Sequence, residues 1–230
     1  MLNPSGLLLA ASQVTLNFGK TLQKPTSSIL IILAVTVLAV APSALILLTG
    51  FTRIIIVLGL TRQALGLQTT PPNQVLIGIA LFVSIFLMAP TLGAMNHDGL
   101  QPYLHGEVSA TTAFDRAEVP LKQWMLKQTG QEELAVTTKA AHEHPSQPMK
   151  VSLPVLIPAF LLTQLKSAFI IGFVIFVPFL IIDLVVSATI MSMGIVMLPP
   201  TLVSLPFKLL LFVLVDGWVL VTQSLITSFR

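Results

Sequence analysis

The residues that could do chemistry are few in this 230-residue sequence, and most of them share one stretch. All 4 histidines and 12 of the 21 charged residues (12 Lys and Arg plus 9 Asp and Glu) lie between Asn96 and Lys150. His142, Glu143 and His144 are of types that bind metals, but they stand among proline, serine and glutamine. A solvated loop is the preferred interpretation, so we predict no metal site and no cofactor.

A catalytic site is not predicted either. Phe18 to Thr21 imitate the end of a phosphate-binding loop, but Val14 stands where that motif needs a glycine. The chain has no cysteine, which excludes a thiolate nucleophile. The only acids of the apolar halves, Asp183 and Asp216, have no histidine near them in sequence. We therefore expect a protein that is not an enzyme.

The elements that carry these residues are mostly apolar. Hydrophobic residues make up 54% of the chain and charged residues 9%, against about 25% in an average soluble domain. This composition excludes an ordinary soluble protein and a disordered one. Basic residues do not cluster with aromatics, so nucleic acid is not an expected partner. Uncharged runs of membrane-span or shorter length occupy Ile29–Leu48, Val75–Met95, Phe169–Ile182, Leu184–Phe207 and Leu209–Val215.

The pattern predicts an all-α membrane-type protein of kinked hydrophobic helical hairpins with an inserted small polar helical domain. The expected regions are an N-terminal segment (1–28), a first hydrophobic hairpin region (29–95), a polar periplasmic-type domain (96–150) and a second hydrophobic hairpin region (151–230). A polar helix is expected to begin at Pro120, to present Leu121, Trp124 and Met125 on one face, and to stop before Gly130. Basic residues of the 49–74 loop favour the cytoplasm for that loop and the opposite side for the polar domain.

Charged residues within the apolar regions need partners, water or end positions, because each costs about 2.5–3.5 kcal/mol at a bilayer centre. Lys208 and Asp216 are eight residues apart, about 12 Å along a helix, and cannot touch. Ion pairs between helices or subunits are the preferred interpretation; snorkelling to the interface and a proton or ion relay are the alternatives. The candidate assembly and ion-pair residues are Arg53, Lys166, Asp183, Lys208 and Asp216.

Eight short segments resemble, in order, those of the flagellar biosynthetic protein FliP family of type III export-gate proteins. They are TRIIIV at 52–57, ALG at 64–66, PPNQVL at 71–76, LKSAF at 165–169, IGF at 171–173, PFLIIDLV at 178–185, LPFKL at 205–209 and LVDGW at 214–218. The injectisome counterpart is the close alternative, but FTR at 51–53 and TPPN at 70–73 look more like the flagellar branch. A secondary transporter is a less favoured alternative.

The resemblance implies a core subunit of the flagellar type III protein export gate. By resemblance the chain is a homo-oligomer, a pentamer, that joins Q-type and R-type export-gate subunits and other export apparatus membrane proteins. The closed channel would pass unfolded flagellar proteins, and the subunit would nucleate assembly of the apparatus. The implied location is the bacterial inner membrane and its periplasmic face at the flagellar basal body. Its apolar hairpins would then pack largely against one another.

Two departures from the family's pattern affect the candidate site. Consecutive methionines commonly follow the family's glycine and form a ring that closes the pore. Here we expect a constriction with less methionine, made by Met193, Gly194, Ile195, Val196 and Met197. An acid usually precedes the Leu-Lys pair, and this chain has Gln164 there, so Lys166 needs a different partner.

Overall fold

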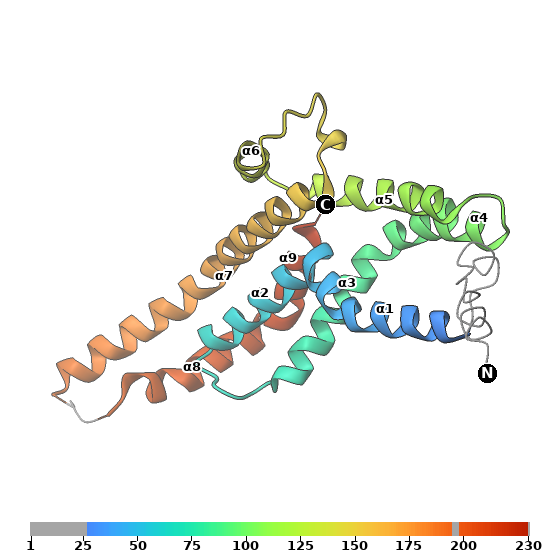
Figure 1. Ribbon diagram of the computed structural model, residues 1–230. Helices are drawn as coiled ribbons and strands as arrows, with labels where there is room; N and C mark the ends of the chain where they lie inside the picture. Colours follow the sequence, from blue (N-terminus) through green and yellow to red (C-terminus); the bar gives the residue numbers. More distant parts are fainter. Residues whose placement is uncertain (1–26, 195–197, 230) are drawn as a thin grey trace, which may run out of the picture. The chain divides into compact units, whose positions relative to one another are not determined.

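The computed structural model of the chain describes residues 27–194 and 198–229, and every regular element in these ranges is a helix (Figure 1). Neither range contains a β-strand, so the all-α prediction is confirmed. The chain divides into two compact units, residues 1–43 and 44–230. The first predicted region, 1–28, lies almost wholly outside the described residues.

The described helices follow one another with short connections. In chain order they are α1 (Ser27–Leu48), α2 (Phe51–Ala64), α3 (Asn73–Met95), the π-helical turn η3 (Asn96–Leu100), α4 (Gln101–Leu104), α5 (Ala110–Lys127), α6 (Gln131–Ala140), the short η4 (Pro148–Lys150), α7 (Leu153–Ser192), α8 (Pro200–Leu214) and α9 (Gly217–Thr227).

Helix α7 is the longest element, at 40 residues or about 60 Å. It runs through Pro158 and Pro178, and it also passes Asp183, where the charge pattern had divided two apolar runs. A charge with a partner does not end a helix, whereas a left-handed residue and a proline pair do. Helix α7 accordingly ends at Ser192, just before Gly194 with φ +74°, and α8 begins at the second residue of the Pro199-Pro200 pair.

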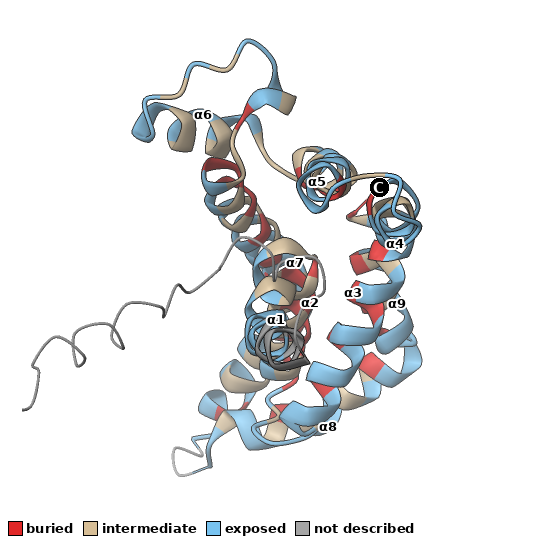
Figure 2. Ribbon diagram, turned by 45° about the vertical axis from the view of Figure 1, so that its right-hand side comes forward, coloured by how far each residue is buried: buried red, intermediate tan, exposed pale blue. Residues whose placement is uncertain are grey.

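The centre of the described unit is α2, which packs against α3 and α7. Figure 2 shows buried residues on these facing helices. At Gly172 of α7 an added Cβ would lie 2.2 Å from Leu60 of α2, so the missing side chain permits this close approach. The buried side chains of this core are Ile54, Val57, Leu58, Ala64, Leu65, Leu76, Ala80, Val83, Ala168, Phe179, Phe212, Val221, Leu225 and Phe229.

The polar section begins inside a continuous helix, because α3 runs through η3 into α4 without a break. Its main helix, α5, begins at Ala110, so the prediction that Pro120 occupies the first helical position was wrong. Ser109 caps the true start by accepting a hydrogen bond from the Thr112 amide. Pro120 sits within the helix, where it costs one backbone donor without ending it.

The apolar face predicted on this polar helix packs onto the hydrophobic regions. Leu121 and Met125 are buried in a second core cluster, which α3 supplies with Met88 and α7 with Phe160. Trp124 joins it with its ring 5.3 Å from that of Phe160. The polar section and the apolar helices therefore share one core within this unit.

Two of the described helices, Asn73–Leu104 and Leu153–Ser192, are long and apolar enough to cross a membrane. Two bent helix pairs would bring the number to four if each were one span. One pair includes α2, and the other is α8 with α9, which meet at 64°. The helices therefore have the lengths and composition of a membrane protein.

Candidate functional site

A charged network ties together α2, α7 and α8. The ammonium of Lys208 on α8 lies 2.6 Å from a carboxylate oxygen of Asp183 on α7. The same ammonium donates a hydrogen bond of 3.1 Å to the carbonyl of Ala64, the last residue of α2. The Lys208 side chain is 6% exposed and that of Asp183 is 34% exposed. Three helices thus converge on one neutralised pair.

The helix geometry explains this convergence. Ser204 stands four residues before Lys208, on the same face of α8, and its hydroxyl donates to the second Asp183 oxygen at 2.6 Å. The carbonyls of a helix's last turn lack partners within the helix and carry partial negative charge. The end of α2 therefore supplies Lys208 with a second acceptor, and both Asp183 oxygens are satisfied.

A second buried cation, Arg53 on α2, has no carboxylate partner among the described residues. One guanidinium nitrogen donates to the Ser228 carbonyl at 2.7 Å and to its hydroxyl at 3.1 Å. The other terminal nitrogen donates to the Gln128 side-chain oxygen at 3.5 Å. The guanidinium carbon lies 4.0 Å from the centre of the Phe229 ring. With 3% of Arg53 exposed, snorkelling to the interface is excluded for this residue.

Gln128, at the end of α5, completes this second cluster. Its side-chain oxygen accepts from Arg53, and its side-chain nitrogen donates to the Phe229 carbonyl at 2.8 Å. The Phe229 ring also stacks on Trp124. Gln128, Ser228 and Phe229 were not predicted as site residues, because partners 75 and 175 positions away from Arg53 leave no local pattern in the sequence.

Lys166 on α7 finds two acids in α6. Its ammonium lies 3.1 Å from Glu132 and 2.9 Å from Glu133. The hydrogen bond from Lys166 is the main reason that the pKa of Glu133 is held below its ordinary value. Gln164, which replaces an expected acid, is buried and donates to the Gln128 carbonyl at 3.4 Å. The partner that Lys166 lacked in the sequence is thus supplied by the polar section.

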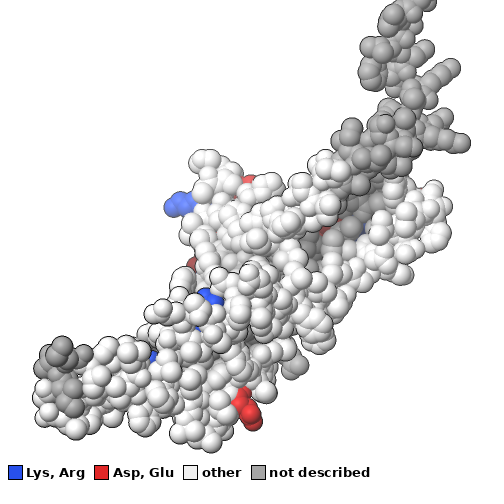
Figure 3. All heavy atoms as spheres, turned by 90° about the horizontal axis from the view of Figure 1, so that it is seen from below, with Lys and Arg blue, Asp and Glu red and all other residues white. Residues whose placement is uncertain are grey.

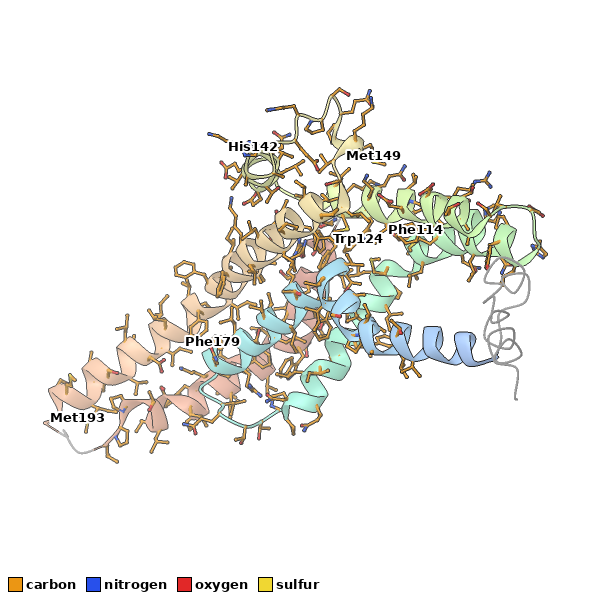
Figure 4. The ribbon with its side chains drawn as sticks, in the orientation of Figure 1. Phe114, Trp124, His142, Met149, Phe179 and Met193 are labelled. Carbon is orange, nitrogen blue, oxygen red and sulfur yellow. The ribbon has the colours of Figure 1, made fainter. Side chains whose placement is uncertain are left out.

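The candidate metal-binding loop has a different role in the structure. The Glu143 carboxylate accepts hydrogen bonds from the hydroxyl and the backbone amide of Ser152, the residue that directly precedes α7. These bonds lower the pKa of Glu143. No group of three metal-ligating side chains forms within the described ranges. Figure 4 shows His142 in the loop that Glu143 ties to the start of α7.

Asp216 is separate from these networks. It forms the break between α8 and α9, in the left-handed conformation with φ +51°. Its side chain is exposed and makes neither a hydrogen bond nor an ion pair with any described residue. Of the five candidate charges, the structure brings Asp183 and Lys208 together and leaves the other three apart.

The expected constriction lies at the far end of the α7–α8 hairpin. Met193 is 68% exposed at the end of α7, where Figure 4 labels it, and Leu198 is 51% exposed across the turn. Gly194 adopts φ +74°, a conformation that glycine accepts without strain. The other predicted members, Ile195, Val196 and Met197, lie outside the described residues. The described part of the tip is apolar, and Met193 and Leu198 are mostly left uncovered by the described residues.

Similarity to known proteins identifies the family of this chain. A family model described as the FliP family matches residues 34–225, which is most of the chain. This chain belongs to the FliP family. The flagellar biosynthetic protein FliP of Bacillus subtilis is 50% identical over 205 residues, which cover 89% of this chain and 93% of the relative. The protein of the same name from Aquifex aeolicus is 46% identical, over 88% of this chain and 86% of its own length. The one from Caulobacter vibrioides is 45% identical, over 96% of this chain and 84% of its own length.

The FliP-family chain exposes much of its apolar surface. In the most hydrophobic 18-residue window of α7, 11% of the residues are buried. Phe173 is 71% exposed, and Leu184 and Val185, which follow Asp183, are each 60% exposed. Figure 3 shows one face that is mostly uncharged, with isolated acidic and basic groups. The most apolar stretch of α7 is therefore left largely uncovered by the described residues, whereas other parts of the same helix pack against α2.

Proposed function

We propose that this protein is a component of the flagellar export apparatus and a core subunit of its gate. Copies of the chain would surround a closed channel through which unfolded flagellar proteins are exported, and their ring would nucleate assembly of the apparatus. Membership of the FliP family and relatives named as flagellar biosynthetic proteins support the flagellar role. Two structural features support the finer part of the proposal: the exposed apolar surface of α7 and α8, and the apolar tip of their hairpin.

The observation that carries the proposal is the unpaired apolar surface of α7 and α8. Phe173 of α7 is 71% exposed, and Leu210 and Val213 of α8 are 59% and 71% exposed. A surface of this composition needs lipid or protein around it. A hairpin that also contains a neutralised pair, Asp183 with Lys208, is suited to burial between copies of the chain. We therefore assign this surface to contacts between protomers and with the Q-type and R-type subunits.

The hairpin tip is suited to close a channel. Met193 and Leu198 present apolar side chains at the turn, and Gly194 lets the chain reverse there. Methionine adapts to irregular shapes, so a ring of such tips would seal without a fixed complementary surface. In the proposed gate, residues 193–197 of each copy converge on the axis. The location would be the inner membrane at the flagellar basal body, with the polar section toward the periplasm.

The experiment that tests the proposal is reconstitution of the purified complex in planar bilayers. Native mass spectrometry of the same sample counts the copies of the chain. We expect several copies and low ionic conductance for the wild-type complex, and a large rise in conductance after deletion of residues 194–197. A matched control deletes the loop residues 144–147, which lie in the polar section away from the tip.

Two outcomes would overturn the proposal. A strictly monomeric chain in the presence of all membrane subunits would remove the oligomeric gate. Unchanged conductance in an intact complex that lacks residues 194–197 would remove the role of the tip. A secondary transporter would instead show solute uptake by the chain alone.

A further inference from the structure

An apolar trough lies between the connection from α2 to α3 and the end of α8. It encloses about 420 Å³, and α3, α8, α9 and the connection itself all contribute to its lining, with Leu65, Val75, Ile79, Leu209 and Phe212 among the lining residues. Leu65 and Phe212 are buried and form its floor, whereas Val75 and Ile79 on α3 are 48% and 36% exposed. The trough can therefore be entered along the exposed face of α3.

Arg62, in the last turn of α2, is held at the rim of this trough. One terminal nitrogen of its guanidinium donates to the Pro71 carbonyl at 3.1 Å and to the Asn73 side-chain oxygen at 2.6 Å. Pro71 itself lines the trough, and Asn73 stands two residues before the lining residue Val75. The connection that forms one wall of the trough thus also fixes the position of the cation.

The positive charge of Arg62 is not neutralised by the described residues. Both of its acceptors are neutral, and no carboxylate in residues 27–194 or 198–229 forms an ion pair with it. Its Nε is buried without a hydrogen-bond partner in the same ranges. Lys208, which precedes the lining residue Leu209, is already paired with Asp183. A half-buried guanidinium with unused donors beside an apolar trough favours a ligand that combines an anion with an apolar chain.

The position of Arg62 along the helices matches that of a lipid phosphate. The stretch Asn73–Leu104 is long and apolar enough to cross a membrane, and its first residue contacts Arg62. The first residue of such a span meets the headgroups, and the apolar residues that follow meet the acyl chains. The basic residues of the 49–74 section favour the cytoplasmic side, where the leaflet carries anionic lipid.

We propose that Arg62 and the trough bind one phospholipid with an anionic headgroup. The guanidinium donates to the lipid phosphate, and one acyl chain lies in the trough along α3 and α8. The trough has the volume of a small-ligand site, about 300–1,000 Å³, and an acyl chain is narrow and flexible enough to follow it. This inference goes beyond the proposed function and does not depend on it, because it requires contact with lipid and not a gate.

The test uses the purified full chain in detergent micelles that contain a small fraction of phosphatidylglycerol or of phosphatidylcholine with the same acyl chains. Native mass spectrometry counts the lipids that each chain retains, and thermal unfolding checks that each variant is folded. Arg62→Gln removes the charge, whereas Arg62→Lys keeps it. Ile79→Trp fills the trough, and Ile77→Trp is the matched control at an exposed residue of α3 that does not line it.

We expect the wild-type chain to retain phosphatidylglycerol about fivefold more than phosphatidylcholine, which is the contribution of one cation near an anionic lipid surface. Arg62→Gln should lower the retention of phosphatidylglycerol to that of phosphatidylcholine, and Arg62→Lys should keep most of the preference. Ile79→Trp should lower the retention of both lipids, while Ile77→Trp should behave as the wild type. Inorganic phosphate should not displace the lipid, because it has no acyl chain.

Four results would contradict this inference. A well-folded Arg62→Gln chain that still prefers phosphatidylglycerol would remove the role of the cation. Unchanged retention of both lipids by Ile79→Trp would place the acyl chain elsewhere. Displacement of the lipid by inorganic phosphate would assign Arg62 to a free anion. A changed number of copies in Arg62→Gln, with lipid retention unaltered, would assign the trough to a second copy of the chain.

Discussion

Two buried cations, Lys208 on α8 and Arg53 on α2, are held by different kinds of partner. Lys208 pairs with the carboxylate of Asp183 at 2.6 Å, whereas Arg53 is held by a carbonyl, a hydroxyl, an amide oxygen and an aromatic ring. The ammonium of lysine is a compact, strongly hydrated charge, while guanidinium is delocalised and more weakly hydrated. A buried lysine therefore needs an acid here, and a buried arginine can be held by neutral acceptors.

The two cations also connect different parts of the fold. Lys208 and its acid lie 25 residues apart on consecutive helices, α7 and α8. Arg53 joins α2 to the end of α5 and to residues that follow α9. The first cation fixes the long hairpin to the core, and the second fixes the chain's last described residues to the polar section.

The largest effect is expected from Lys208→Met, which leaves the Asp183 carboxylate without its cation. Breaking a buried pair in this way costs about 3–5 kcal/mol, and the partial exposure of Asp183 places this case toward the lower end. The double variant Asp183→Asn with Lys208→Met should recover much of the loss, because no charge remains. Thermal unfolding of the purified protein in detergent measures both, with Lys127→Met as an exposed-lysine control.

Equal destabilisation in the single and double variants would show that the charge pair is not what holds α8. It would then be the packing of the lysine's carbon chain that matters, and the contrast with Arg53 would lose its basis.

A smaller loss is expected from Arg53→Leu, about 2–3 kcal/mol, since it leaves the Gln128 oxygen and the Ser228 carbonyl without a donor. Arg53→Lys should recover only part, because one ammonium cannot reproduce the fork that reaches both groups. Hydrogen exchange of the amides at Ser228 and Phe229 should rise in both variants. The same amides in Lys208→Met should stay protected at mild temperature, since that variant acts at the other site.

If Arg53→Lys were as stable and as protected as the wild type, a point charge would be sufficient at this position. The distinction between the two cations would then rest on their neighbours alone.

The sequence was sufficient to predict the helical class. It also predicted that charges in the apolar regions have partners, which holds for four of the five candidates among the described residues and not for Asp216, but it did not identify the partners. Long uncharged runs predict helices of membrane length, and the spacing of Leu121, Trp124 and Met125 predicts an apolar face. Ser204 and Lys208 also share a helix face by spacing. Which acid faces Lys208 depends on how α7 and α8 align, and no local pattern in the sequence specifies that alignment.

The same limit explains the errors and omissions. The start of α5 was misplaced because Pro120 has a strong preference for a first helical position, and the Ser109 cap outweighed it. Arg53 was predicted as an assembly and ion-pair residue, with snorkelling as an alternative, and its neutral partners Ser228 and Gln128 were not predicted, since nothing near Arg53 in sequence indicates them. Partners more than 70 residues away are set by the packing of the whole unit.

The smallest effect is expected at Lys166, the cation of α7 that is 53% exposed and faces Glu132 and Glu133. Exposed ion pairs contribute little because water screens them. Because the folded protein lowers the pKa of Glu133 below 4.5, its contribution to stability is present above pH 4.5 and is lost as the pH falls through the lowered pKa.

The protection of α6 amides against hydrogen exchange, corrected for the intrinsic pH dependence of exchange, should therefore fall about a few-fold below pH 4.5. Glu133→Gln should show the reduced protection at every pH and abolish this step, while Glu107→Gln should leave it unchanged. If Glu133→Gln kept a fall in protection of the same size, the fall would belong to another acid. If the fall corresponded to a loss of stability as large as that caused by Lys208→Met, exposure would not set the strength of these ion pairs. The expected effects therefore decrease from Lys208 to Arg53 to Lys166. A buried cation has lost its hydration and must be stabilised by protein groups, whereas water stabilises the exposed Lys166 with or without its acids.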